Sequence, residues 1–141
     1  MEEAPVKIFL DANILFSASL PGSRLASFLK ELSKRATLIT NDYAEIEARR
    51  NLANKKAFPE EALTDCMSRV KLHQTVQMNL SIELAGKDLP ILAGAISSRA
   101  DILLTGDKRD FGHLFGKTIY GVTVLNVNGL LAWLRDRGMI Q

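Results

Sequence analysis

Residues that dominate several specialised classes of protein are scarce in this 141-residue chain. It contains one cysteine, Cys66, and two histidines, His73 and His113. An internal disulfide needs two cysteines, and a structural zinc site needs a regularly spaced set of cysteines and histidines, so both are excluded. We expect Cys66 to be a buried, inert thiol and the two histidines to be ordinary surface or hydrogen-bonded residues.

Long apolar runs and a strong charge of one sign are also absent. No run approaches the roughly 18 apolar residues that a membrane-spanning helix needs. The chain begins Met-Glu-Glu-Ala-Pro, which is acidic where a secretory signal is basic, so we expect a cytoplasmic protein with no membrane partner. A net charge of +2 is far from that of many DNA-coating proteins but leaves nucleic acid open as a transient substrate.

The apolar residues that are present form short strand-like runs that alternate with helical patterns. This alternation predicts an α/β fold with a mostly parallel sheet covered on both faces, and the length favours a single domain over residues 1–141. The apolar run at 14–16 leaves open a longer first strand, and Val70 continues the apolar stripe of a helix that opens at Pro59. Predicted strands are 6–10, 37–40, 102–104 and 122–125, and predicted helices start near residues 23, 43, 58, 88 and 128.

Acidic residues stand where these elements meet. Asp11 follows the first predicted strand, Asp107 follows a Thr-Gly turn after the third, and Asp88 opens a helix. The carboxyl ends of strands form the ligand-binding edge of an open α/β sheet, so we expect these acids to converge, with Asp110 and one helical glutamate near them. Clustered carboxylates repel one another unless a cation offsets them, and Mg²⁺ and Mn²⁺ prefer oxygen ligands. The pattern therefore indicates divalent metal and phosphate chemistry.

Each acid also has a purely structural explanation. Asp88 lies two residues before Pro90 and suits a helix N-cap, Asp11 and Asp107 suit turns, and Asp110 suits a solvated surface position. Helix 43–55 carries two candidates, Glu45 and Glu47. They point about 200° apart, so only one of them can face the site, and the apolar stripe does not decide which.

Four segments place these acids in a recognisable pattern. They are Phe9-Leu10-Asp11-Ala12-Asn13; Thr40-Asn41-Asp42-Tyr43 leading to Glu47-Ala48-Arg49-Arg50-Asn51-Leu52; Asp88-Leu89-Pro90-Ile91-Leu92-Ala93-Gly94-Ala95; and Leu104-Thr105-Gly106-Asp107. Together they resemble the PIN-domain nucleases, in the order of that family and across nearly the whole chain. The resemblance implies a three-layer α/β/α sandwich with an acidic pocket at the carboxyl edge of its sheet, and it selects Glu47 over Glu45. Asn41 departs from the usual serine but is an equally good cap.

The resemblance implies a metal-dependent endoribonuclease that hydrolyses phosphodiester bonds in single-stranded RNA. Bound Mg²⁺ or Mn²⁺ would lower the pKa of a coordinated water and stabilise charge on the phosphorus. The residues that match the family's catalytic and metal-binding positions are Asp11, Glu47, Asp88 and Asp107. Those that match its supporting polar positions are Asn13, Thr105 and Asp110.

Basic side chains in the same segments are candidates for holding the RNA backbone, although solvated surface charge explains each of them equally well. These candidates are Arg49, Arg50, Lys55, Lys56, Lys108 and Arg109. Many small PIN proteins resemble toxins that an antitoxin neutralises by filling the pocket, and dimers are common in the family. An antitoxin partner and a homodimer are therefore further expectations.

Two other functions compete with this hypothesis. The first is a Mg²⁺-dependent phosphoryl-transfer domain of the receiver or haloacid-dehalogenase type. The phosphatase requires a second aspartate two residues after the first, where this chain has Asn13, and the receiver requires an acidic pair by the first strand. The second is a catalytically inactive PIN-like RNA-binding module, against which the four intact acids argue.

Overall fold

The computed structural model describes residues 4–55 and 60–140. These residues form a six-stranded sheet with the order β3-β2-β1-β4-β6-β5. All neighbouring pairs are parallel except β5 and β6, which form an antiparallel hairpin. The strands are β1 (Lys7–Leu10), β2 (Thr37–Asn41), β3 (Val70–His73), β4 (Ile102–Leu104), β5 (Thr118–Ile119) and β6 (Val122–Leu125).

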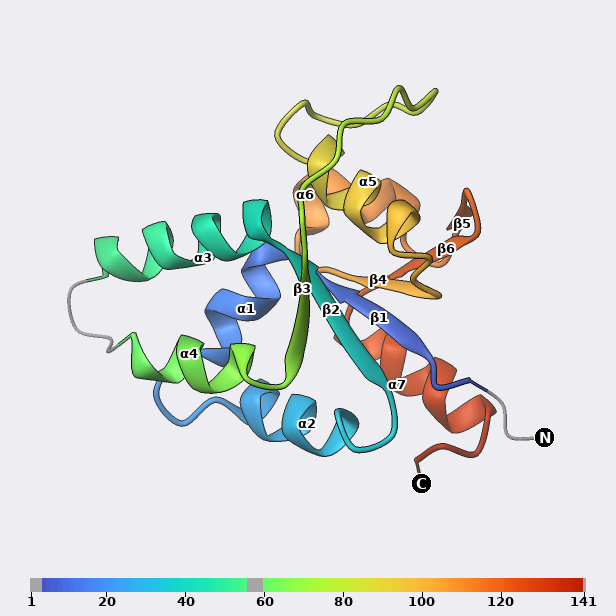
Figure 1. Ribbon diagram of the computed structural model, residues 1–141. Helices are drawn as coiled ribbons and strands as arrows, with labels where there is room; N and C mark the ends of the chain where they lie inside the picture. The colour runs from blue at the N-terminus through green and yellow to red at the C-terminus, as the bar shows by residue number, and fades with distance from the viewer. Residues whose placement is uncertain (1–3, 56–59, 141) are drawn as a thin grey trace.

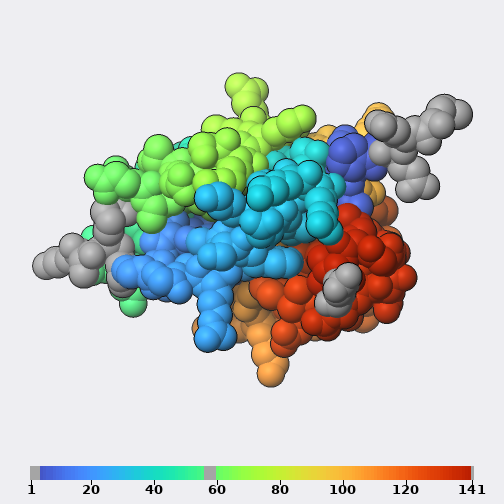
Figure 2. Space-filling view, turned by 90° about the horizontal axis from the view of Figure 1, so that it is seen from below, coloured from blue at the N-terminus to red at the C-terminus, as the bar shows by residue number. Residues whose placement is uncertain are grey.

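Helices cover both faces of the sheet, which confirms the expected three-layer sandwich (Figure 1). One face carries α1 (Ala12–Ala18), α2 (Arg24–Leu32), α3 (Asp42–Asn54), α4 (Glu61–Met67) and α7 (Val127–Asp136), and the other carries α5 (Leu89–Ser97) and α6 (Lys108–Phe111) with the 3₁₀ turn Gly112–Leu114. Seen from below, α2 and α7 form adjacent parts of the surface, with α4 beside α2 (Figure 2). None of the described helices is both long enough and apolar enough to span a bilayer.

The central strands are buried on both faces, as expected for parallel strands between helical layers. Residues 8–10 of β1 and 102–104 of β4 are fully buried. Helix α5 packs closely on this core because residue 94 is glycine. A Cβ atom there would lie 2.7 Å from Phe9 Cζ and 2.6 Å from Asn41 Nδ2, far inside normal contact. Gly94 thus allows α5, which Asp88 precedes, to approach β1 and β2.

The order in which the chain adds strands reverses between β1 and β4, and in open α/β sheets ligands bind at the carboxyl ends of the strands on either side of such a point. The chain builds β2 and β3 on one side of β1 and then crosses to build β4 and β6 on the other. The backbone N–H of Asp11, just past β1, donates to the carbonyl of Leu104 at the end of β4 (3.0 Å). The segments that carry Asp11 and Asp107 therefore meet here, as the sequence predicted.

Two interpretations of the sequence were wrong, and one strand was missed. The run 14–16 lies in helix α1 and does not extend β1. Val70 begins edge strand β3 and does not continue the stripe of α4. The hairpin strand β5 was not foreseen. The predicted helix start at Pro59 lies outside the described residues, and α4 begins at Glu61.

Candidate active site

Asp11 is the most strongly supported acid of the site. Its Oδ1 accepts from the backbone N–H of Ala12 (2.6 Å), and its Oδ2 accepts from Thr105 Oγ1 (2.7 Å) and Asn13 Nδ2 (3.1 Å). The residue is 3% exposed. Burial raises the pKa of Asp11 to about 6 against the lowering effect of the bonds from Thr105 and Ala12, and the charges of Glu47 and Asp107 raise it further. The carboxylate is consequently held in one orientation.

Asn13 and Thr105 join the segment after β1 to the segment after β4. Asn13 Oδ1 accepts from the backbone N–H of Gly106 (2.8 Å), while its Nδ2 donates to Thr105 Oγ1 (3.3 Å). Thr105 Oγ1 also accepts from the backbone N–H of Asp107 (3.1 Å). These two side chains, both chosen from the sequence, therefore hold the Asp107 segment against Asp11.

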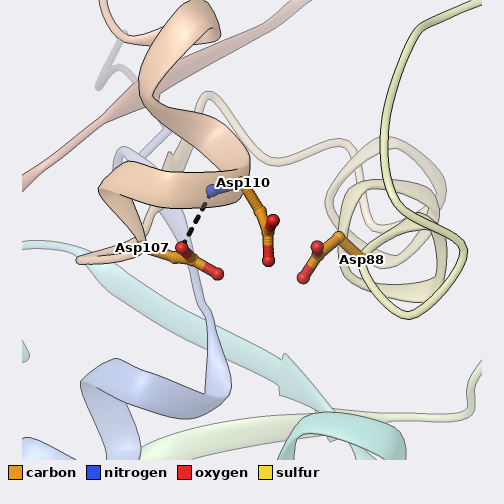
Figure 3. Close-up of side chains that lie close together, drawn as sticks. All are labelled: Asp88, Asp107 and Asp110. Carbon is orange, nitrogen blue, oxygen red and sulfur yellow. Dashed lines mark hydrogen bonds between the residues drawn. The ribbon is translucent and has the colours of Figure 1, made fainter.

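Three other acids point toward one another and form what we call the acidic trio: Asp88, Asp107 and Asp110 (Figure 3). One carboxylate oxygen of each lies within 4.8 Å of those of the other two. Asp107 also caps α6, because its Oδ1 accepts from the backbone N–H of Asp110 (3.0 Å). The trio thus combines the start of α5 with the start of α6.

Asp88 is buried without full hydrogen bonding. It is 6% exposed, and its Oδ2 has no hydrogen-bond partner among the described residues. Its side chain makes no capping bond to α5, so the N-cap explanation is wrong even though Asp88 occupies the cap position. Burial first, and then the neighbouring Asp110, raise the pKa of Asp88 to about 7.

The two glutamates of α3 face different surroundings. Glu45 Oε2 lies 3.4 Å from Arg49 Nη2, in a pair one helical turn apart. Glu47 lies close enough for its negative charge to raise the pKa of both Asp11 and Tyr43. Glu47 therefore faces the acids, on the side of α3 opposite to the Glu45 pair.

Tyr43 and Lys87 also line the site, and sequence analysis missed both. The Tyr43 hydroxyl donates to the carbonyl of Lys87 (2.8 Å), and burial, followed by Glu47 and Asp88, raises the pKa of Tyr43. Lys87 Nζ lies 3.0 Å from Asp110 Oδ2, an ion pair that raises the pKa of Lys87 and lowers that of Asp110. The available signals were weak: Tyr43 is one turn before Glu47 on the same face, and Lys87 directly precedes Asp88.

The basic candidates divide into paired and exposed side chains. Arg49 contacts both Glu45 and Glu60, each at 3.4 Å, so its guanidinium is already paired with two carboxylates. Arg50 is exposed and shares the Glu47 face of α3. Lys108 and Arg109 are exposed on α6, and Arg109 borders a pocket of about 420 Å³ that also includes Asp110 and His113. Lys55 is exposed beyond the end of α3, and Lys56 lies outside the described residues.

The donor set fits a hard divalent cation. All the grouped ligands are carboxylate oxygens, which Mg²⁺ and Mn²⁺ prefer over sulfur or nitrogen. The buried and unpartnered Asp88 Oδ2 is an uncompensated polar atom, which a cation would satisfy. The trio is therefore a group of acids that could hold a divalent ion.

Comparison with solved structures identifies the architecture. A chain in the crystal structure of VapBC2 from Rickettsia felis, bound to a DNA fragment from their promoter, matches with a TM-score of 0.60 and 17% identity over 86% of this chain and 98% of that chain. A chain in the structure of FitAB bound to an IR36 DNA fragment matches with a TM-score of 0.53 and 18% identity over 84% of this chain and 94% of that chain. The chain has the PIN-domain fold.

The PIN-like sandwich that the four sequence segments implied is thus confirmed. At these identities the likeness establishes the fold alone, because one fold can carry unrelated functions. No protein-family model and no curated protein sequence matches the chain.

Proposed function

We propose that this PIN-fold chain is a divalent-metal-dependent endoribonuclease that hydrolyses phosphodiester bonds in single-stranded RNA. The observation that carries the proposal is the unpartnered, buried Oδ2 of Asp88, which faces Asp107 and Asp110 at the carboxyl edge of the sheet. A cluster of carboxylates with a buried, unpartnered member destabilises a fold unless a cation offsets its charge. Mg²⁺ and Mn²⁺ both suit this all-oxygen site.

In this proposal Asp11, Glu47, Asp88 and Asp107 hold the ion. A divalent ion bound there would supply the Lewis acid that activates the attacking water and offsets charge on the phosphate. Asp11 Oδ1 has a single protein donor, so it keeps a lone pair for a ligand. Asp110 lies within the same trio, although the sequence suggested only a supporting role for it.

The surrounding side chains orient the acids and neutralise the substrate. Thr105 and Asn13 fix the Asp11 carboxylate through the bonds described above. Exposed Arg50, Lys108 and Arg109 flank the acids and are our candidates for contacts to RNA phosphates. Arg49 is a weaker candidate, because a phosphate would have to compete with two glutamates for its guanidinium.

We further propose that the chain is the toxin of a toxin–antitoxin pair and that its partner is an antitoxin protein. The support is that VapBC2 and FitAB, whose chains share this fold, are toxin–antitoxin systems with PIN-domain toxins. The phosphoryl-transfer alternative is disfavoured by Asn13. Its amide is fully used between Asp11 and Gly106, where a phosphatase needs a free acid.

The test is a cleavage assay with the purified chain and an end-labelled single-stranded RNA. We expect products in millimolar Mg²⁺ or Mn²⁺, none in EDTA, and none with a folded Asp107→Asn variant. RNA binding without cleavage in either metal would contradict the proposal in favour of the inactive RNA-binding module. Metal-dependent hydrolysis of an aryl phosphate without RNA cleavage would instead favour the phosphoryl-transfer domain.

A further inference from the structure

Lys87 already places a positive charge at the acidic trio. Its ammonium lies 3.0 Å from Asp110 Oδ2, and this is the only ion pair to the trio within residues 4–55 and 60–140. The side chain is 63% exposed, so the ammonium is in contact with solvent. The backbone at Lys87 is fixed, because its carbonyl accepts from the Tyr43 hydroxyl. The ammonium can therefore move while the peptide that leads to Asp88 stays in place.

The acid that Lys87 contacts belongs to the trio, so the ammonium lies beside the other two acids as well. One carboxylate oxygen of Asp110 lies within 4.8 Å of one on Asp88 and one on Asp107. An ammonium is a compact point charge with three donors, so it partly neutralises a carboxylate group that lacks another cation. It does not satisfy the site completely, because the buried Oδ2 of Asp88 remains without a partner among the described residues.

We propose that Lys87 competes with the divalent ion for the acidic trio and is displaced from Asp110 when the ion binds. This inference rests on the metal site of the proposed function. In that site the ion takes oxygens of Asp88 and Asp107, and one carboxylate oxygen of each lies within 4.8 Å of one on Asp110, the residue that holds Lys87. Breaking an ion pair whose ammonium is in contact with solvent costs little free energy, whereas the ion also satisfies Asp88. Lys87 thus sets the metal concentration at which the protein loads.

Calorimetric titration with Mn²⁺ alone tests the proposal without measuring catalysis. Lys87→Met keeps the length of the side chain but removes the ammonium, and we expect it to bind Mn²⁺ about fivefold more tightly than the wild type, the equivalent of releasing one exposed ion pair. Lys87→Arg retains the charge and should bind Mn²⁺ as the wild type does. Lys87→Ala repeats the test with a truncated stem.

Lys108→Met is the matched control, since it makes the same change in net charge at an exposed lysine one residue from Asp107. We expect its Mn²⁺ affinity to change by less than about twofold, because an exposed charge with no partner in the trio is screened by salt. Unchanged or weaker binding by Lys87→Met, or equal tightening by Lys108→Met, would overturn the inference while leaving the metal site intact. No Mn²⁺ binding by any folded variant would overturn the inference and the proposed function together.

Discussion

Asp11 and Asp88 are both buried acids at the same edge of the sheet, yet the protein treats them in opposite ways. Three donors hold the Asp11 carboxylate, whereas Asp88 Oδ2 has no partner among the described residues. The fold gives the first carboxylate its hydrogen-bond donors and leaves one oxygen of the second without any, which our proposal assigns to a cation. A site can therefore combine one preset ligand with one whose burial is relieved only on binding.

The sequence around each acid explains the contrast. Asn13 and Thr105 are placed by the ends of β1 and β4 to donate to Asp11. Asp88 occupies the cap position of α5, but Pro90 has no N–H to donate to a capping side chain, and the N–H of Ile91 donates instead to the backbone carbonyl of Asp88 (3.1 Å). Asp88 is consequently free of the capping role and its carboxylate turns toward Asp107 and Asp110 (Figure 3).

The largest expected effect comes from Glu47, the proposed metal ligand on α3, which is neither of the two acids compared above. Glu47→Gln should reduce metal-dependent RNA cleavage roughly 100-fold or more, because the amide keeps the shape but loses the charge that a hard cation needs. Glu45→Gln, on the opposite face and paired with Arg49, should retain activity within about twofold, since its carboxylate faces away from the acids and is already engaged by a guanidinium. The measurement is initial cleavage rate at matched melting temperatures. Loss of activity in Glu45→Gln with retention in Glu47→Gln would mean that the wrong glutamate was chosen.

The next largest effect is expected from removing the hydrogen bond that Thr105 donates to Asp11. Thr105→Val preserves shape but removes the 2.7 Å bond to Asp11 Oδ2, and it should lower cleavage by roughly 10–100-fold, as is typical for groups that orient metal ligands. Thr40→Val is the control, because Thr40 is equally buried near a strand end but donates to the carbonyl of Leu10. If both variants lose activity equally, the effect reflects packing and not the orientation of Asp11.

A third experiment measures how much the buried, ionised Asp88 side chain lowers the free energy of unfolding of the metal-free protein. Because its pKa is raised from 3.8 to about 7, the metal-free folded state holds this proton more tightly than the unfolded state. The folded state therefore has its full free energy of unfolding below about pH 4, where Asp88 is protonated in both states. Part of that free energy is lost as the pH rises toward 7, because the unfolded state ionises Asp88 first. Asp88→Asn should be more stable than the wild type by up to about 4 kcal/mol at pH 8 and within about 1 kcal/mol of it near pH 4.

Urea unfolding in EDTA at both pH values measures this difference. Asp11→Asn should gain less stability at pH 8, because its amide would meet the donors Asn13 and Thr105 that now serve a carboxylate. A larger gain for Asp11→Asn than for Asp88→Asn would reverse the comparison on which this account depends.

The smallest effect is expected on RNA binding, and it compares Arg50 and Arg49, which lie on different faces of α3. In an Asp107→Asn background, Arg50→Ala should weaken binding of single-stranded RNA by about threefold and reduce the salt slope by about one, the signature of one lost phosphate contact. Arg49→Ala should change neither quantity, because Glu45 and Glu60 already occupy that side chain. Fluorescence anisotropy across a salt series gives both numbers, and an equal loss for Arg49→Ala would assign RNA to the other face.

The sequence was sufficient for the sheet centre because its strands are continuous apolar runs ended by turn residues, as at 102–104. It was insufficient for α1, since a short apolar run at 14–16 has no period that separates a helix from a strand. Strand β3 was missed because an exposed edge strand lacks an apolar pattern. The β5–β6 hairpin turns at Tyr120 and Gly121, both with positive φ, and Tyr-Gly is a weaker turn signal than Asn-Gly.

The candidate site divides in the same way. Asp11 and Asp107 could be placed together because parallel strand ends share an edge, and their neighbours Asn13 and Thr105 followed from the family pattern. Lys87 could not be placed, because its contact with Asp110 joins the starts of α5 and α6. How these two helices pack against each other cannot be predicted from the sequence of either one. The same packing explains why Asp110 lies in the trio instead of merely beside it.

The central claim is that a divalent ion binds at the acidic trio, where Asp88 Oδ2 has no partner among the described residues, and a thermal-shift titration tests it most directly. At pH 7.5 the melting temperature of the wild type should rise with Mn²⁺ concentration, because the ion binds the folded cluster and not the unfolded chain. Asp88→Asn should begin with a higher melting temperature and rise little. A wild-type protein that shows no shift at millimolar Mn²⁺, or an Asp88→Asn variant that shifts as much as the wild type, would contradict the claim.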